Sequence, residues 1–424
     1  MTAARRGRLP AIVLAVVALA AATVAAAARA EQPEAAVRPG PPAATAQAPM
    51  TQAQIPRPPM ASPVVHDDGR VTVTLVAPEA RSVTIAGAEL RSLLGADSLR
   101  LTRNDQGIWT GTIGPLEPGI YEYGLAVDGL VVTDPLGVGV MGGRTGARGI
   151  LEVPGRGDTP RIDQWQDVPH GAVTRHWYES KATGTRRSLH VYTPPGYHAA
   201  GHSYPVVYLL HGSGDDDRHW SELGRANVIA DNLIAAEGCV PQVIVMPEGH
   251  PAGGPPRVKW DSPEAADYAR RNGTLFAADL LEEVVPLVES RYRTRADRGS
   301  RAIVGLSMGG RQALDVGLRH LDTFAAVGSF SGATNGLDAA LAALAADPAA
   351  ANRRLDLLWI GIGRDDFLLD SNRAFTARLG TIGIRHDYEE TDGGHSWGVW
   401  RRYLAGLLPR LFRAAPAVRP ASPP

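Results

Sequence analysis

The sequence predicts an α/β domain with a mainly parallel sheet, preceded by a small all-β sandwich. Two observations lead to this prediction. In residues 172–414, short apolar runs alternate with helical patterns, as expected for parallel strands covered by helices on both faces. In residues 62–155, short segments alternate apolar and polar residues and are separated by glycine and proline turns. We therefore expect two folded parts of different class in one chain.

The bulk composition excludes several classes of protein. The chain has 424 residues, a length that suits about two to three domains. Its formal net charge is −1, so charge gives no reason to expect a nucleic acid or an anionic membrane as a partner. The single cysteine, Cys239, permits no intramolecular disulfide and no cysteine-rich zinc site. We expect neither a metal nor another cofactor.

The first 30 residues predict a secretory signal peptide. A basic start, "MTAARRGRLP", precedes an alanine-rich apolar run, and "ARA" at 28–30 supplies small residues for cleavage after Ala30. The alternative is an uncleaved membrane anchor, because the apolar run approaches the length of a membrane span. The alanine richness favours cleavage. We expect a secreted or periplasmic protein with no membrane association after cleavage.

The next segments predict a linker and the sandwich. Residues 31–61 are rich in Pro, Ala and Gln and cannot form a core, and residues 415–424 form a similar tail, for which we expect disorder. In the sandwich, "GRVTVTLVAP" places Val71, Val73 and Leu75 on one face of a strand. We expect about seven strands there and no strong helix.

The second part contains five buried-strand patterns. They occupy residues 205–210, 242–247, 301–306, 324–330 and 355–363. Helical patterns lie between them, for example over residues 277–292 and 309–321. The stretch "RSLHVYTPPGY" precedes them and is typical of one arm of a hairpin.

Two stretches match G-x-S-x-G, the pattern of a nucleophile elbow. One has Ser307 at its centre and the other has Ser396. An elbow requires a buried strand, a tight turn and then a helix. Only the match at 305–309 lies between a strand pattern and a helix pattern, whereas the match at 394–398 follows a polar loop. Ser307 is therefore the predicted nucleophile.

A serine hydroxyl needs a base, and the base needs a carboxylate to orient it. In α/β-hydrolases these residues follow the serine in the order acid, then histidine. His395 lies in a glycine-flanked loop before a helix, so it is the predicted base. Asp366 and Asp365 follow the last strand pattern. We favour Asp366 as the acid, with Asp365 as the alternative.

The oxyanion of an acyl-transfer intermediate needs two backbone donors. The residue after the nucleophile, Met308, supplies the first N–H group. The second is expected in the loop after the first long strand, where Gly212 and Gly214 allow the backbone to approach a substrate. We assign it to the N–H of Ser213.

Six motifs in order resemble the putative-esterase family of α/β-hydrolases. They read "LLHGSGDD", "VIVMPEGH", "LLEEVVPLVESRY", "VGLSMGG", "GIGRDDF" and "GGHSWGVW". That family includes feruloyl and acetyl-xylan esterases, esterase D, enterochelin esterases and mycolyltransferases of the antigen 85 type. The resemblance implies an α/β-hydrolase fold and the same five roles, with Asp366 as the acid by its spacing from the strand. The sandwich resembles the immunoglobulin-like domain that precedes such esterases.

The resemblance predicts a serine carboxylic ester hydrolase. The expected partner is a small-molecule or polysaccharide ester, with acyl or feruloyl esters of carbohydrate favoured. The alternatives are a mycolyl-type acyltransferase, an enterochelin-type esterase and a non-catalytic glycan-binding protein. Trp397, Trp220 and Glu248 are the candidate substrate contacts, although relatives often carry Asn where this chain has Glu248.

Overall fold

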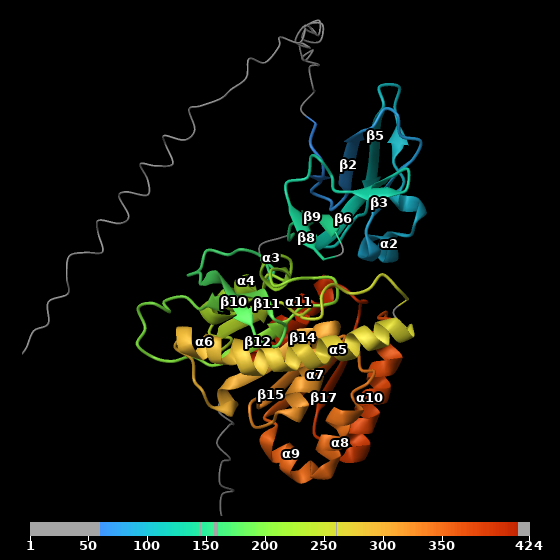
Figure 1. The fold of residues 1–424 in the computed structure, drawn as a ribbon. Helices are drawn as coiled ribbons and strands as arrows, with labels where there is room; N and C mark the ends of the chain where they lie inside the picture. The colour runs from blue at the N-terminus through green and yellow to red at the C-terminus, as the bar shows by residue number, and fades with distance from the viewer. Residues whose placement is uncertain (1–59, 145, 157–159, 260, 414–424) are drawn as a thin grey trace, which may run out of the picture. The chain divides into compact units, whose positions relative to one another are not determined.

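The structure is a computed structural model that describes residues 60–413 except 145, 157–159 and 260 (Figure 1). These described residues belong to one compact unit. The predicted signal peptide, the predicted tail and all but the last two residues of the predicted linker lie outside the described residues. None of the helices in these described ranges has the length and apolar character needed to cross a membrane.

The first part of the described chain consists of two antiparallel sheets. One has the strand order β1-β2-β5-β4, and the other has the order β3-β6-β9-β8, with β7 paired to β6. Val71, Val73 and Leu75 alternate inward and are at most 6% exposed, as their pattern predicts. The strands are β1 (Val64–Val65), β2 (Val71–Val76), β3 (Val83–Ala86), β4 (Thr102–Arg103), β5 (Ile108–Ile113), β6 (Gly119–Val127), β7 (Leu130–Val132), β8 (Val140–Gly143) and β9 (Gly146–Val153).

This part also contains a helix that the sequence did not predict. Helix α2 (Ala88–Leu94) has only seven residues and is followed by the 3-10 turn η1 (Asp97–Leu99). Leu90 is its one fully buried residue and packs into the core between the sheets. A helix of two turns with a single buried residue has no clear apolar periodicity, which explains why the pattern did not reveal it.

The second part is built on an eight-stranded sheet with the order β10-β11-β13-β12-β14-β15-β16-β17. The first two strands form the expected antiparallel hairpin, β11 also runs antiparallel to β13, and all other neighbours are parallel. The strands are β10 (Ala172–Ser180), β11 (Thr185–Thr193), β12 (Val206–Leu210), β13 (Val243–Pro247), β14 (Arg301–Leu306), β15 (Ala326–Phe330), β16 (Leu357–Gly363) and β17 (Asp387–Thr391).

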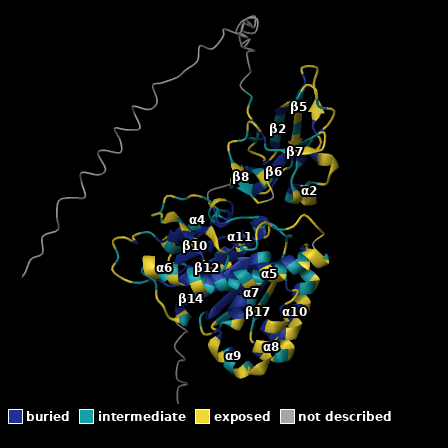
Figure 2. Cartoon of the chain, in the orientation of Figure 1, coloured by how far each residue is buried: buried dark blue, intermediate teal, exposed yellow. Residues whose placement is uncertain are grey.

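Helices cover both faces of this sheet. Along β12, Tyr208 contributes to the core beneath α5, α7, α8 and α10, whereas Leu209 contributes to the core beneath α4 and α11. Figure 2 shows the sheet strands as buried and the outer sides of the helices as exposed. The helices are α3 (His219–Glu222), α4 (Ala226–Ala235), α5 (Pro263–Asp279), η2 (Leu280–Val284), α6 (Val285–Arg291), η3 (Arg298–Ser300), α7 (Met308–Arg319), α8 (Asp338–Ala346), α9 (Pro348–Arg354), α10 (Leu369–Ile382), α11 (Trp397–Leu407) and η4 (Leu408–Arg410).

The predicted class is confirmed: a mainly parallel α/β sheet follows antiparallel β sheets. The strand order also indicates at which edge of the sheet a catalytic site would lie. The carboxyl ends of β14, β16 and β17 meet at this edge, where loops can bring distant residues together.

Candidate active site

Ser307 lies in the tight turn between β14 and α7. All six residues of β14 are buried, and the helix begins at the next residue, Met308. Ser307 has φ 52° and ψ −113°, an unfavourable conformation for a residue with a side chain. Its N–H donates to Phe330 O at 2.9 Å, which helps to hold the turn. Such strain is characteristic of a nucleophile elbow.

The two glycines of this motif are sterically required. A Cβ on Gly305 would lie 2.3 Å from Gly309 O, so strand and helix could not approach each other this closely. A Cβ on Gly309 would lie 2.5 Å from the carbonyl oxygens of Leu210 and His211. Both clashes involve backbone atoms, which cannot rotate away as a side chain can. The close packing therefore explains the pattern at residues 305–309.

The structure brings Ser307, His395 and Asp366 together from three loops at one edge of the sheet. His395 Nε2 lies 3.0 Å from Ser307 Oγ, and His395 Nδ1 lies 2.9 Å from Asp366 Oδ2. The geometry suits a ring whose Nδ1–H donates to the carboxylate while Nε2 accepts the serine proton. This hydrogen-bonded chain is the arrangement that the sequence predicts for a nucleophile, base and acid.

The structure also distinguishes the two candidate acids. The Asp366 side chain is fully buried beside His395, whereas Asp365 is exposed. Burial alone would raise the pKa of the Asp366 carboxyl. The hydrogen bond and charge of His395 and the Leu368 N–H outweigh burial, so the pKa lies below its ordinary value. The Asp366 carboxylate is therefore ionised when it orients His395.

Aromatic rings surround the base but most of them are buried. The His395 ring packs edge-on against Trp400 at 4.9 Å between centroids and lies 4.6 Å from the ring of Phe367. Phe367 is 67% exposed, so it is the aromatic residue beside the base that a substrate can reach. Sequence patterns do not single out Phe367, because it follows the acid in a loop with no periodic pattern.

The predicted contacts of substrate with Trp220 and Trp397 are wrong in this structure. These side chains are 1% and 5% exposed, and their rings pack edge-on against each other at 5.2 Å. Trp220 Nε1 donates to Leu210 O, in the strand that precedes the oxyanion loop. Both rings therefore support the loops of the site from the core. Trp397 is the first residue of α11 and lies on the buried side of that helix. Its closeness to His395 in the sequence gave no sign of this burial.

The two predicted oxyanion donors belong to segments that lie close to Ser307. Met308 follows it at the start of α7, and a Cβ on Gly212 would lie 3.7 Å from Ser307 Cβ. Ser213 is exposed and has no hydrogen-bond partner among the described residues, so its N–H is available to a ligand. The loop of Gly212 and Ser213 thus lies close to the nucleophile, and the oxyanion hole formed by Met308 and Ser213 stays a prediction.

His211 controls the direction of the Ser213 N–H. Gly249 N–H donates to His211 Nε2 at 2.8 Å, so in the neutral ring the proton lies on Nδ1, which donates to Gly212 O at 2.8 Å. The peptide that joins Gly212 to Ser213 is planar and trans, so its N–H points opposite to its C=O. The hydrogen bond from His211 to the Gly212 carbonyl therefore also sets the direction of the Ser213 N–H.

Gly214 is held at both of its backbone polar groups. Its N–H donates to His250 Nε2 at 3.1 Å, and its carbonyl accepts the N–H of Arg144 at 2.8 Å. Burial, and then the nearby charges, lower the pKa of His250 to about 2, so the ring is neutral and can accept this bond. Arg144 belongs to the turn between β8 and β9, so the antiparallel part contacts the oxyanion loop.

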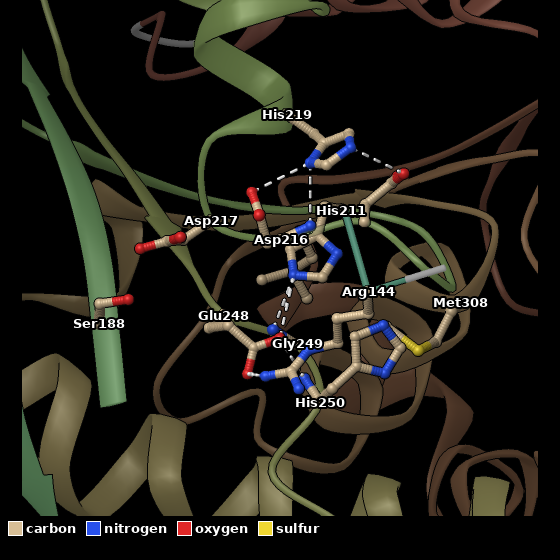
Figure 3. A network of polar contacts seen from close by, with 12 residues as sticks. Arg144, Ser188, His211, Asp216, Asp217, His219, Glu248, Gly249, His250 and Met308 are labelled. Atoms are coloured by element: carbon tan, nitrogen blue, oxygen red, sulfur yellow. Dashed lines mark hydrogen bonds and ion pairs between the residues drawn. The ribbon is translucent and has the colours of Figure 1, made fainter. Parts of the chain in front are cut away.

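Glu248 is an ion-pair partner inside the protein. It is 6% exposed and accepts two hydrogen bonds from Arg144, at 3.1 and 2.7 Å. Arg187 donates to the same carboxylate at 3.3 Å and to Asp279 at 2.9 Å. Two guanidinium groups therefore occupy its oxygens, and Figure 3 shows the one of Arg144. A contact of Glu248 with substrate stays a prediction.

A second residue of the antiparallel part lies beside the base. Glu89, in α2, lies close to Ser396, the residue after His395, since a Cβ on Gly398 would lie 3.6 Å from Glu89 Oε1 and 3.8 Å from Ser396 Oγ. Burial raises the pKa of Glu89, although Ser396 and Arg401 oppose that rise. Sequence reasoning missed Glu89 and Arg144, since both lie far along the chain from the loops that they meet: Arg144 is 70 residues before Gly214. Ser396 is thus a neighbour of the base and lies close to Glu89.

The described residues contain no cluster of three or more His, Cys, Asp or Glu side chains arranged to hold a metal ion. In the acidic stretch at 215–217, Asp216 pairs with Arg218 at 2.7 Å, and Asp217 pairs with His190 at 3.2 Å. These carboxylates have protein partners.

Comparisons with known proteins find similarity to esterases. A family model described as Putative esterase matches residues 180–411. An endo-1,4-beta-xylanase/feruloyl esterase from Xylanibacter ruminicola is 29% identical over 357 residues, which cover 83% of this chain and 46% of that protein. Esterase Rv1288 from Mycobacterium tuberculosis is 28% identical over 298 residues, which cover 58% of this chain and 60% of that protein. The chain thus spans about half the length of these relatives.

Among solved structures, the enterobactin esterase FES from Shigella flexneri has a TM-score of 0.58 to this chain. The match covers 81% of this chain and 92% of that chain at 19% sequence identity. At this identity the likeness shows the fold alone. It confirms the α/β-hydrolase fold that the motifs predict.

Proposed function

Because the chain belongs to the putative esterase family, we propose that it is a serine carboxylic ester hydrolase that uses Ser307, His395 and Asp366. The observation that carries the proposal is the hydrogen-bonded chain from Ser307 Oγ through His395 to Asp366. Each residue has the position its role requires: the serine is at a strained turn, the base is partly exposed, and the acid is buried.

In the first half-reaction, Ser307 Oγ attacks the ester carbonyl carbon while His395 Nε2 accepts the hydroxyl proton. The carbonyl oxygen becomes an oxyanion that the N–H groups of Met308 and Ser213 stabilise. The imidazolium formed on His395 is stabilised by the Asp366 carboxylate. When the tetrahedral intermediate collapses, the C–O bond to the alcohol breaks. His395 gives its proton to the departing alkoxide, and the acyl group remains on Ser307.

In the second half-reaction, water attacks the acyl carbon. His395 takes one proton from the water, and the same two N–H groups hold the second oxyanion. Collapse of this intermediate breaks the bond to Ser307 Oγ, which regains a proton from His395. The products are a carboxylic acid and the free enzyme. Both half-reactions use protein groups and water only.

For the substrate, we propose acyl or feruloyl esters of carbohydrate. The relative from Xylanibacter ruminicola is named as a xylanase and feruloyl esterase, and 83% of this chain aligns with it. The exposed ring of Phe367 beside the base is an apolar surface against which an aryl acyl group can pack. We also propose that the protein acts outside the cytoplasm, on the basis of the predicted signal peptide.

A substrate panel on the purified full chain tests this function. Methyl ferulate, p-nitrophenyl acetate, feruloylated arabinoxylan and acetylated xylan are compared for kcat/KM. The proposal expects hydrolysis of the small esters and of at least one polysaccharide ester. If none of the four is hydrolysed by folded protein, the proposed function is wrong. Formation of acyl-sugars from added sugar acceptors, at the expense of free acid, would identify a transferase instead.

A further inference from the structure

A polar cleft of about 460 Å³ lies next to the loops that hold the oxyanion turn. Its wall includes Arg144, Glu248 and His250, which support that turn, and its other side is formed by β10 and β11. In Figure 3, Ser188 of β11 and Asp217 appear on the side of Glu248 away from Met308. The cleft is separate from Ser307, His395 and Asp366, none of which lines it.

Trp177 presents an aromatic surface at this cleft. It is 47% exposed, although it lies within a strand of the main sheet. The guanidinium of Arg175 lies 4.2 Å from the centre of its ring, and that of Arg186 lies 5.3 Å away. Single exposed apolar side chains are common. This ring, however, is held by two cation–π contacts at the rim of a cleft.

Hydrogen-bonding groups lie on the same face of the hairpin as Trp177. Trp177 pairs with Ser188 across the two strands, and side chains two residues apart in a strand share a face. Arg175 donates to Ser188 Oγ at 3.1 Å and lies 3.6 Å from Asp217 Oδ2. Asp217 is 2% exposed, so its carboxylate fixes the direction of the Arg175 side chain. An exposed ring bordered by fixed polar groups suits a sugar, which has both apolar C–H faces and hydroxyl groups.

The strand order places this face at the edge of the sheet where Ser307 lies. β11 runs antiparallel to β13, so its first residues lie at the carboxyl ends of the parallel strands. Three strands, β11, β13 and β12, separate β10 from β14. Neighbouring strands are about 4.8 Å apart, so Trp177 is roughly 19 Å across the sheet from the nucleophile strand. That separation is too large for an acyl group bound to Ser307 and suits another part of a polymeric substrate.

We propose that this cleft is a second binding subsite that holds the carbohydrate chain of a polysaccharide ester. A sugar ring packs against the part of the Trp177 side chain that is exposed, while Arg175 and Ser188 bind its hydroxyl groups. The subsite anchors the polymer at a distance from the ester bond that Ser307 attacks. This inference rests on the proposed function for the identity of the ligand, but its binding can be measured without catalysis.

The test uses the full chain carrying Ser307→Ala, so that the polymer is not altered. Binding is measured as retardation in native gels that contain increasing concentrations of soluble wheat arabinoxylan. We expect retardation of Ser307→Ala, and a dissociation constant about three- to tenfold higher when Trp177→Ala is added. Trp177→Phe is expected to restore part of the binding, because it keeps an aromatic face.

The matched control is Trp165→Ala in the same Ser307→Ala background. Trp165 is 55% exposed, packs edge-on against His170 and does not line the cleft. Its loss should leave retardation unchanged. The proposal is overturned if Ser307→Ala is not retarded, if Trp177→Ala binds as well as its parent, or if Trp165→Ala weakens binding equally. Thermal unfolding of each variant identifies misfolding. If Trp177→Ala does not fold, the dissociation constants of Trp177→Phe and Trp165→Ala are compared instead, and Trp177→Phe is expected to bind more weakly. Failure of the proposed function would instead appear as an inactive unmutated chain in the ester panel.

Discussion

Arg144→Ala removes the side-chain link between the antiparallel part and the oxyanion loop. The Arg144 N–H still donates to Gly214 O in the variant, so only the two bonds to Glu248 are lost. Hydrogen bonds to charged groups contribute about 1.5–3 kcal/mol. The Arg144 side chain is 35% exposed, so solvent screening reduces this to about 1–1.5 kcal/mol. Glu248 keeps Arg187 as a partner, so no buried charge is left alone.

A loss of this size corresponds to at most about tenfold in rate if it is felt entirely at the transition state. We expect kcat for p-nitrophenyl acetate to fall about three- to tenfold while KM changes little, because the loop holds an amide that contacts the developing oxyanion. Arg148→Ala is the matched control, since its guanidinium donates to Ala147 O in the same hairpin. A kcat within twofold of the unmutated chain, or a rise in KM alone, would refute the reasoning.

Three further predictions concern the catalytic residues and the elbow. Asp366→Asn should lower kcat by about 10³–10⁴, because an amide no longer selects the histidine tautomer. Asp365→Asn should change kcat less than about twofold, and equal losses of kcat in steady-state assays would contradict the assignment of the acid. Because the folded pKa of Asp366 lies below its ordinary value of 3.8, its carboxylate stabilises the fold above about pH 4 and this contribution is lost as the pH falls through the folded pKa. The difference in unfolding free energy between the unmutated chain and Asp366→Asn should therefore shrink below pH 4 in urea titrations, and a difference that stays constant to pH 2 would oppose this account. Gly309→Ala should cost about 1–3 kcal/mol or more in the same titrations, because its Cβ would meet two carbonyl oxygens at 2.5 Å, and an unchanged midpoint with full activity would count against the steric argument.

The parts of the site that the sequence revealed are those specified by local pattern. A buried strand, two glycines and a helix place Ser307 within ten residues, and the order of acid and histidine follows from the fold. The sequence could not decide between Asp365 and Asp366 from their neighbours alone. Their difference is burial, which depends on how the loop after β16 packs against His395.

The parts that the sequence did not reveal arise from contacts between distant segments. Arg144 reaches Glu248 across 104 residues, and no local pattern marks either side chain as a partner of the other. Trp177 was not identified, because the alternation of side chains along β10 does not show which face of the strand is exposed to solvent. Trp220 and Trp397 were assigned to the substrate on their distance in sequence from the loops, but helix orientation buries both.

The central claim is that Ser307, rather than Ser396, is the nucleophile. It is tested most directly by treating the full chain, Ser307→Ala and Ser396→Ala with a fluorophosphonate probe, followed by peptide mapping of the labelled residue. We expect one label on Ser307 in the unmutated chain and in Ser396→Ala, and none in a folded Ser307→Ala. Labelling of Ser396, or persistent labelling and ester hydrolysis in Ser307→Ala, would contradict it.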